Sequence, residues 1–254
     1  MIGIRLPGHR RRIIENILFT FLLVSCSSSL SPPNAPANMV LVPAGDFLMG
    51  SSEDEVADAF PQHVVPLDSY WMDIYEVTNE QYHKCVDVGA CYEPEDLRYF
   101  NYPEFASHPV VYITWFDALA FCRWNDKRLP TEAEWEKAAR GGRGRRYPWG
   151  DDLATTNLNA GSRLAGTTPV GSYSDGASPY GAMDMAGNVW EWVMDWYEPY
   201  PGTSFIGDFF GDKYKVLRGG SWNHPDRDAR TFYRDIAHPN RTFAVVGFRC
   251  AADG

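Results

Sequence analysis

The stretch that most constrains the fold runs from Asp184 to Tyr197 and mixes large aromatic rings with oxygen-bearing side chains. Its second half holds four of the largest side chains, Trp190, Trp192, Trp196 and Tyr197. Aromatic side chains bury about 150–250 Å² each, so a segment this rich in them must pack against much of the remaining chain. The stretch therefore predicts an aromatic core strand that follows a glycine turn.

The same stretch offers oxygen ligands at close spacing. Asp184 and Glu191 carry carboxylates, and the turn at Gly187 and Asn188 exposes backbone carbonyls between them. Calcium favours several hard oxygen ligands drawn from one irregular loop, so a calcium site is one interpretation. The other is that the two acids face water beside a core strand, because the sequence holds no calcium consensus of the helix–loop–helix kind.

The segment Gly187–Trp192 is similar to the core signature of the formylglycine-generating enzyme family, also called sulfatase-modifying factor domains. Further motifs follow in the order of that family: Met39–Gly50, Tyr75–Asn79, Lys127–Glu136, Pro148–Gly150, Arg218–Trp222 and Gly247–Cys250. The resemblance covers residues 39–253. It implies a C-type-lectin-like fold of the formylglycine-generating enzyme type, with few short helices and much irregular chain.

The N-terminal residues resemble an export signal. A basic stretch ends at Arg12, and the apolar run Ile17–Val24 is shorter than the roughly 20 residues that span a bilayer. The run ends at Leu23–Cys26, which resembles a bacterial lipobox. An ordinary signal peptide with an incidental cysteine is the alternative.

We therefore expect three regions. Residues 1–25 are a lipoprotein signal peptide, 26–38 are a lipidated Cys26 with a flexible Pro- and Ser-rich tether, and 39–254 are one folded domain. The expected location is the bacterial cell envelope, with the lipid anchor in the outer membrane.

The charge balance excludes one class of partner. The chain has 33 acidic and 23 basic residues, a net charge of −10, which becomes −13 without the four arginines and one glutamate of residues 1–25. Such a surface repels phosphate backbones, so we expect no nucleic-acid partner. We expect contact with the membrane through the lipid anchor only, and a peptide or an envelope protein as the ligand.

Four cysteines follow Cys26, and an even number in an exported chain predicts disulfides. Local spacing favours the pairing of Cys85 with Cys91, while the family resemblance implies the pairing of Cys122 with Cys250. Reactive thiols are the competing interpretation, but neither pair has the Cys-x-x-Cys spacing of redox motifs.

Three helices have start signals. Thr78 and Thr131 begin capping-box patterns, which predict helices over about 79–88 and from Thr131 to Gly141, and Thr114 caps another. Short strands and glycine turns are expected from Tyr147 onward, with a terminal strand over 244–252. Few helices beside much sheet and irregular chain predict an α+β domain.

The resemblance also implies ligand residues. One structural calcium ion of the related enzymes is held by positions that match Asp184, Gly187, Val189 and Glu191, the middle two through their carbonyls. A second calcium site would begin at Asn157 and the carbonyl of Leu158. The acid expected next falls at Ser162, which has no carboxylate, and one charge fewer weakens a calcium site.

The residues of the family's oxidase chemistry are replaced. The related enzymes place one redox-active cysteine two residues after the tryptophan of Arg218–Trp222 and another five residues later, and these thiolates bind copper(I). His224 and Ala229 occupy the two positions here. Neither forms a disulfide with a substrate, so we expect no copper and no formylglycine-generating activity.

Two functions remain open. The first is a non-catalytic binding or scaffold module whose ligand groove is formed by Ser221, Trp222, His224 and Arg230 and roofed by an aromatic loop over 92–105. The alternative is an enzyme of another reaction type that uses a metal centred on His224. Metal analysis separates them, because stoichiometric iron or copper favours an enzyme.

Overall fold

The computed structural model describes residues 1–3, 36–52 and 56–254. The folded unit spans Ala35–Gly254. The expected signal peptide, apart from its first three residues, and the expected lipidation site Cys26 lie outside the described residues. Within the part of the chain that is described, no helix is both long enough and apolar enough to cross a membrane.

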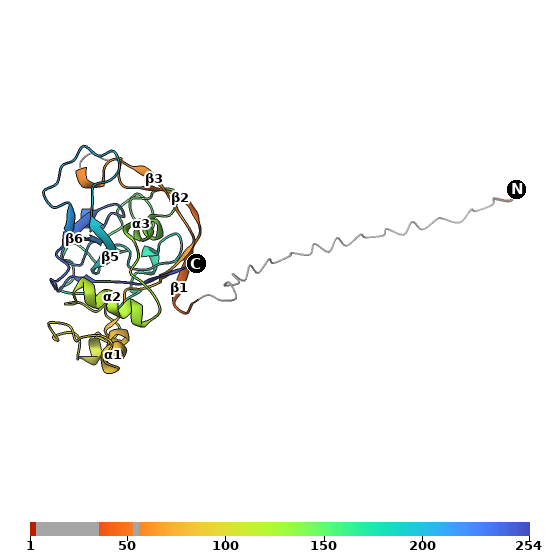
Figure 1. Cartoon of the computed structure of the whole chain (residues 1–254). Helices are drawn as coiled ribbons and strands as arrows, with labels where there is room; N and C mark the ends of the chain where they lie inside the picture. Colours follow the sequence, from red (N-terminus) through yellow and green to blue (C-terminus); the bar gives the residue numbers. More distant parts are fainter. Residues whose placement is uncertain (4–35, 53–55) are drawn as a thin grey trace. The chain divides into compact units, whose positions relative to one another are not determined.

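The described residues form three small sheets (Figure 1). The first is antiparallel and holds β1 (Met39–Val42), β4 (Tyr70–Asp73) and β9 (Ala251–Asp253), with β4 in the middle. In the second, β2 (Gly45–Met49) pairs with β3 (His63–Leu67). The third has the order β7 (Arg234–Ala237), β6 (Gly211–Arg218), β5 (Trp190–Tyr197) and β8 (Val246–Gly247). Its β5–β8 pair is parallel and its other pairs are antiparallel.

The expected helices are confirmed as α1 (Asn79–Asp87), α2 (Trp115–Trp124) and α3 (Glu132–Arg140). Each begins with a capping box, in which the N-cap threonine and the side chain three residues later satisfy two backbone N–H groups that a helix leaves unpaired. Short 3₁₀ turns complete the described elements: η1 (Ala57–Ala59), η2 (Pro103–Phe105), η3 (Ser174–Gly176) and η4 (Asp226–Ala229).

The aromatic stretch forms β5, as its composition predicts. Trp190 and Trp192 are at most 1% exposed and pack in one core cluster with residues of α1 and α2. Val193 belongs to a second cluster with Trp135 of α3. Because β5 contributes to both clusters, it joins the two halves of the core.

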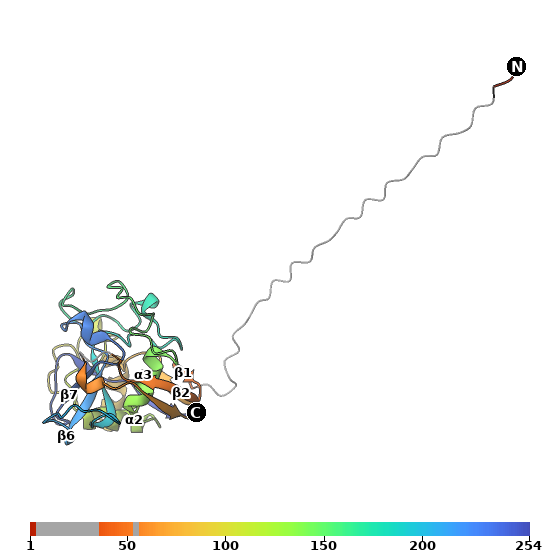
Figure 2. The ribbon, with the colours of Figure 1, turned by 90° about the horizontal axis from the view of Figure 1, so that it is seen from above.

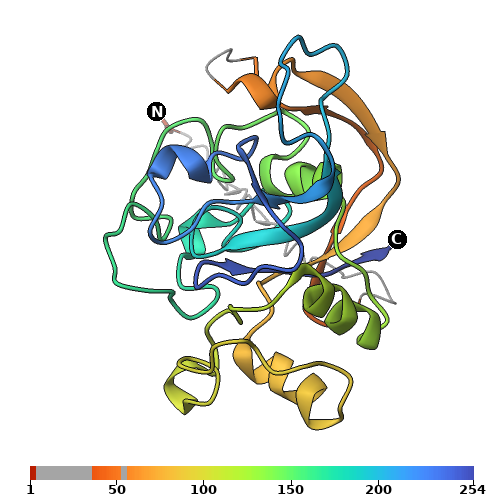
Figure 3. The same ribbon diagram turned by 60° about the vertical axis from the view of Figure 1, so that its left-hand side comes forward.

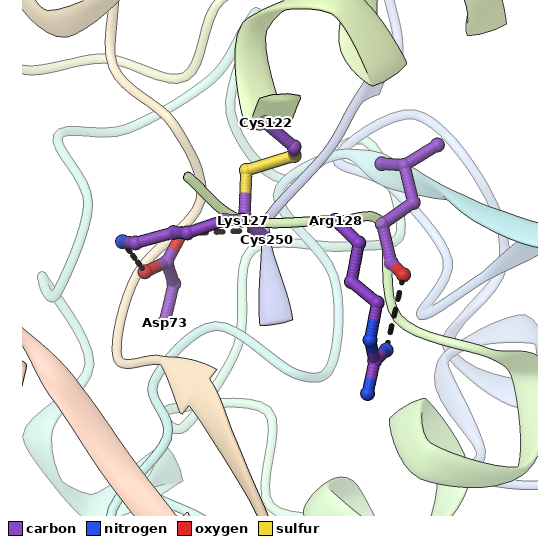
Figure 4. The surroundings of a disulfide bond; sticks show 6 residues. Asp73, Cys122, Lys127, Arg128 and Cys250 are labelled. Carbon is purple, nitrogen blue, oxygen red and sulfur yellow. Dashed lines mark hydrogen bonds and ion pairs between the residues drawn. A yellow bond between two sulfur atoms is a disulfide. The ribbon is translucent and has the colours of Figure 1, made fainter. Parts of the chain in front are cut away.

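Both expected disulfides are present, Cys85–Cys91 and Cys122–Cys250. The second joins α2 to the C-terminal segment across 128 residues. Figure 4 shows Asp73 and Lys127 pointing toward one another beside this disulfide, with 2.6 Å between Oδ1 and Nζ. The disulfide thus ties the C-terminal segment to α2, and Asp73 Oδ2 also accepts a hydrogen bond from the Cys250 backbone N–H at 3.0 Å.

The expectation of a single terminal strand over 244–252 is wrong. The segment forms β8 and β9, which lie in different sheets. Between them Phe248, Arg249 and Cys250 are all fully buried. Successive side chains of a strand point to opposite faces, so three consecutive buried residues favour a break between two sheets.

Candidate ligand site

The residues expected to form the ligand groove lie on the segment that connects β6 to η4, except Arg230, which directly follows η4. Gly219 and Gly220 have φ angles of 99° and 76°, a region that glycine adopts without strain. A Cβ atom on Gly220 would lie 2.9 Å from the backbone nitrogen of Ala229, so the chain folds back closely on η4. Figure 2 shows η4 among the loops that gather on one side of the domain.

Two neighbours hold the His224 ring. Ser221 Oγ lies 2.6 Å from His224 Nδ1, and the indole Nε1 of Trp190 lies 3.3 Å from the same atom. The indole and imidazole rings meet edge to face with 5.6 Å between their centroids. An indole N–H only donates, so Nδ1 accepts and the neutral ring carries its proton on Nε2.

This tautomer disfavours a metal centre on His224. A metal-bound imidazole carries its proton on the other ring nitrogen. Binding a metal through Nε2 would therefore place a proton on Nδ1, facing the indole N–H of Trp190. The described residues also contain no group of three or more His, Cys, Asp or Glu side chains that would hold a metal ion.

The four expected groove residues differ in exposure. Ser221 is fully buried and Arg230 is 8% exposed, whereas Trp222 and His224 are half-buried. Arg230 Nε donates to the Arg227 carbonyl at 2.7 Å, and the guanidinium lies over the Phe232 ring. The surface available to a ligand is therefore formed by Trp222 and His224, with Ser221 supporting the imidazole from behind.

Residues 159–163 form the neighbouring wall, which sequence reasoning missed. The Gly161 and Ser162 backbone N–H groups donate to the His224 and Trp222 carbonyls at 2.7 and 2.8 Å. Arg163 and Asp226 add an ion pair at 2.6 Å. Because the main contacts between the two segments are backbone hydrogen bonds, no residue type in the sequence indicates them.

Asp228 of η4 was also missed. Burial raises the pKa of this carboxyl, and the charge of Arg227 opposes the rise. Its Oδ1 makes no hydrogen bond, although Arg227 Nε lies 3.6 Å away, beyond hydrogen-bonding distance. A single aspartate four residues after a histidine gives too little pattern to be found from sequence.

The aromatic loop over 92–105 does not roof this site, contrary to expectation. Its contacts lie elsewhere: Phe100 stacks on His83 of α1, with ring centroids 3.7 Å apart, and Glu95 accepts a hydrogen bond from Thr242. Figure 3 shows this part of the chain beside α1 at the lower end of the domain, whereas η4 (blue) lies at the upper left.

The two segments expected to hold calcium lie side by side. Asn159 and Gly187 form a parallel bridge, and a Cβ atom on Gly187 would lie 2.4 Å from the Asn159 carbonyl oxygen. Asp184 and Asn188 adopt left-handed backbone conformations, with φ of 57° and 59°. The turn before β5 is therefore an irregular, closely packed loop, as the calcium interpretation requires.

Glu191 is engaged by an arginine. Arg249 donates from Nε to one carboxylate oxygen and from Nη2 to the other, both at 2.7 Å. Trp135 Nε1 donates to the same group at 2.8 Å. The carboxylate is fully buried, so the interpretation in which this acid faces water is wrong.

Two more carboxylates are buried with this pair. Asp184 accepts a hydrogen bond from the Gly171 N–H at 2.6 Å, and Glu76 accepts one from Asn188 Nδ2 at 2.7 Å. Burial raises the pKa of Glu76 well above its usual range, and the charges of Asp184 and Glu191 raise it further. Sequence reasoning missed Glu76, which lies more than 100 residues from the loop that it supports.

This environment fits a cation at the first expected site and not at the second. Three buried carboxyl groups face one guanidinium, so acidic groups outnumber basic ones here. Arg249 binds both oxygens of the Glu191 carboxylate, so an ion would be held by the Asp184 carboxylate and the backbone carbonyls of Gly187 and Val189. Calcium accepts both carboxylate and carbonyl oxygens as ligands. At the second site the Asn157 amide donates to the Asp175 carbonyl at 3.0 Å, and no acid follows at Ser162.

Comparison with known proteins agrees with these motifs. A family model described as "Sulfatase-modifying factor enzyme 1-like domain" matches residues 27–254. The formylglycine-generating enzyme of Bos taurus is 30% identical over 286 residues, covering 87% of this chain and 76% of that protein. A protein named serine/threonine-protein kinase pkn1, from Chlamydia caviae, is 38% identical over 243 residues. That match covers 84% of this chain, which spans only 37% of the relative's length.

Among solved structures, PvdO from Pseudomonas aeruginosa has a TM-score of 0.69 and 26% identity, covering 85% of this chain and 94% of that one. This likeness, the mixed sheets and the few short helices confirm the predicted α+β, C-type-lectin-like fold of the formylglycine-generating enzyme type. Family model, relatives and fold agree, and the chain belongs to the family of sulfatase-modifying factor enzyme 1-like domains.

Proposed function

We propose that this chain is a non-catalytic binding or scaffold module of the bacterial cell envelope, anchored to the outer membrane through a lipid on Cys26. Its ligand is a peptide or an envelope protein. The proposal rests mainly on the position of His224 and on the contacts that its ring makes. This residue stands where the resemblance places the first oxidase cysteine, and Ser221 and Trp190 hold its ring.

The second cysteine position supports the same conclusion. Ala229 is fully buried in a small apolar cluster with Leu158, Ala160 and Ala186. A methyl group in such a cluster contributes packing and no redox chemistry. Every cysteine among the described residues is paired in a disulfide, so none of these four supplies a thiol to this site.

A peptide matches the groups that Trp222 and His224 present. With Nδ1 accepting from Trp190, the His224 N–H on Nε2 is a donor for a backbone carbonyl. Trp222 supplies apolar area, and tryptophan is among the residue types that dominate binding hot spots.

Binding of partners recovered from the envelope fraction tests the proposed site. We expect Trp222→Ala and His224→Ala to weaken binding by about tenfold or more, as removal of a hot-spot residue does. Tyr92→Ala is a matched aromatic control, because Tyr92 is 82% exposed and its loop lies away from η4. Full binding by folded Trp222 and His224 variants, with loss in the control, would place the function elsewhere.

The lipid anchor has a separate test. Cys26→Ser should move the mature protein from the membrane fraction to the soluble fraction without changing its melting temperature. Pro36, the first described residue of the folded unit, follows Cys26 by ten positions, a reach of at most about 36 Å. An unchanged membrane fraction in the variant would exclude this anchor.

We also propose that the loop before β5 holds a structural calcium ion through Asp184 and the carbonyls of Gly187 and Val189. The excess of buried carboxylates over arginine and the irregular backbone at Asp184 and Asn188 support it. Calcium there would fix the turn that precedes β5, and copper is not expected.

A further inference from the structure

A separate groove lies between α3, β5 and β6 and shares no residue with the His224 site. Its volume is about 620 Å³, within the range of about 300–1,000 Å³ found for small-molecule sites. Apolar and aromatic side chains line part of it: Met49, Ala133, Met194, Trp196, Pro199 and Tyr200. The remaining lining residues are charged: Glu132, Asp195, Glu198, Lys215 and Arg234.

Lys215 places an ammonium in the wall of this groove. Its Nζ atom lies 3.7 Å from the Trp196 ring centroid and 4.2 Å from that of Trp115, and it donates to the Met194 carbonyl at 2.7 Å. An ammonium carries three N–H donors, and one is used here. The two indoles stabilise the positive charge. Lys215 is only 3% exposed, and it lines the groove.

Asp195 places a carboxylate in the same groove. It accepts a hydrogen bond from the Glu132 backbone N–H at 2.6 Å. Burial, followed by the charge of Glu132, raises the pKa of Asp195 to about 6, and burial lowers that of Lys215 to about 8. Both groups are therefore charged near pH 7.

These two charges interact without pairing. Among the described residues no ion pair of 4.0 Å or less joins Lys215 to Asp195, although each shifts the other's pKa. Glu132 differs, because Arg218 and Arg234 bind its carboxylate directly. The groove therefore presents the Lys215 ammonium and the Asp195 carboxylate, which a bound molecule can bridge, and the exposed Glu198 adds a second carboxylate.

We propose that this groove binds a free α-amino acid with an apolar side chain. The carboxylate of the ligand accepts from Lys215 and its ammonium pairs with Asp195. The side chain of the ligand lies against Trp196, a residue that is 36% exposed. A zwitterion compensates the charges of Lys215 and Asp195, whereas a simple anion or cation leaves one of these two desolvated and unpaired. This site is independent of the function proposed for Trp222 and His224.

Calorimetric titration of the mature protein at pH 7 tests the ligand class. The probes are L-phenylalanine, N-acetyl-L-phenylalanine and L-phenylalaninamide, and each of the last two lacks one charge of the first. We expect saturable binding of L-phenylalanine and affinities at least about tenfold lower for both blocked forms, the effect of one lost charged contact. Equal affinities for the three probes, or no saturable binding of the free amino acid at millimolar concentration, would overturn the proposal.

Variants on β5 and β6 locate the site. Asp195→Asn and Lys215→Met should each lower the affinity for L-phenylalanine by about tenfold. Lys213→Met and Asp212→Asn, at exposed positions of β6, are the matched controls and should bind normally. Should Lys215→Met fail to fold, Lys215→Arg keeps the charge and should keep binding. Unchanged affinity in a folded Asp195→Asn protein contradicts the assignment.

Discussion

His224 shows how two neighbours determine the chemistry of one side chain. The residue itself is compatible with a metal ligand, a general base or a hydrogen-bond donor. The indole N–H of Trp190 and the hydroxyl of Ser221 both meet Nδ1, so the outward nitrogen carries the proton. The sequence predicted that His224 belongs to the ligand surface, but the tautomer depends on Trp190, 34 residues earlier.

Replacing Trp190 with phenylalanine should weaken the preference of His224 for the tautomer protonated on Nε2. Phenylalanine keeps an aromatic ring and removes the N–H, so the form protonated on Nδ1 should gain population. Nitrogen NMR of the imidazole measures the ratio of the two tautomers. Trp196→Phe, at a position without a ring contact to His224, is the control and should leave the ratio unchanged. An unchanged ratio in Trp190→Phe would show that the indole does not set the proton position.

Arg249 is expected to matter more for stability than its surface counterparts. Arg249→Met leaves Glu191 buried beside Asp184 and Glu76 without its cation, so we expect a loss of about 3–5 kcal/mol in the free energy of unfolding. Arg128→Met breaks more exposed pairs with Glu134 and Asp253 and should cost less than Arg249→Met. Denaturant titration measures the free energy of unfolding of both variants. Equal losses would show that burial does not make the Arg249–Glu191 pair more important for stability.

Elements with local signals were predictable, and elements made by distant contacts were not. The capping boxes at Thr78 and Thr131 lie within four residues, so α1 and α3 could be placed from sequence. The division into β8 and β9 depends on where Arg249 and Cys250 find distant partners, Glu191 and Cys122. No local pattern encodes those pairings.

The contact between β5 and α3 should give a pH-dependent stability. The pKa of Asp195 is raised from 3.8 in the unfolded chain to about 6 in the folded protein, so the folded state binds this proton more tightly. The resulting stabilisation is present below about pH 4 and is lost as the pH rises through 6. Asp195→Asn should remove this contribution. Denaturant titrations at several pH values measure it, and parallel curves for both proteins between pH 4 and 7 would contradict it.

The loop before β5 should respond to calcium. A ligand that binds only the folded state adds about 2.7 kcal/mol at a hundredfold excess over its dissociation constant, so a chelator should lower the melting temperature. Asp184→Asn should weaken this response, whereas Asp175→Asn, at an exposed site, should keep it. A melting temperature that no chelator changes, in a protein without bound calcium, would exclude the ion.

At the scale of the whole molecule, family and fold were predictable because ordered motifs extend over most of the chain. The motifs Tyr75–Asn79 and Gly247–Cys250 meet the aromatic strand in the structure, where Glu76 and Arg249 surround its first residues. The geometry of the site was less accessible to sequence reasoning. Its neighbouring wall is built by backbone hydrogen bonds from residues 159–163, and backbone groups are the same in every sequence.

The most direct measurement of the proposed loss of oxidase activity is the conversion of a sulfatase-type cysteine peptide to its formylglycine form, followed by mass spectrometry. Because His224 and Ala229 supply no thiolate, we expect no conversion above a protein-free control, with or without added copper. His224→Cys alone should also fail, since Ala229 still offers no second sulfur ligand. Copper-dependent turnover by the unmodified protein would contradict a non-catalytic role and would show that this site is catalytic.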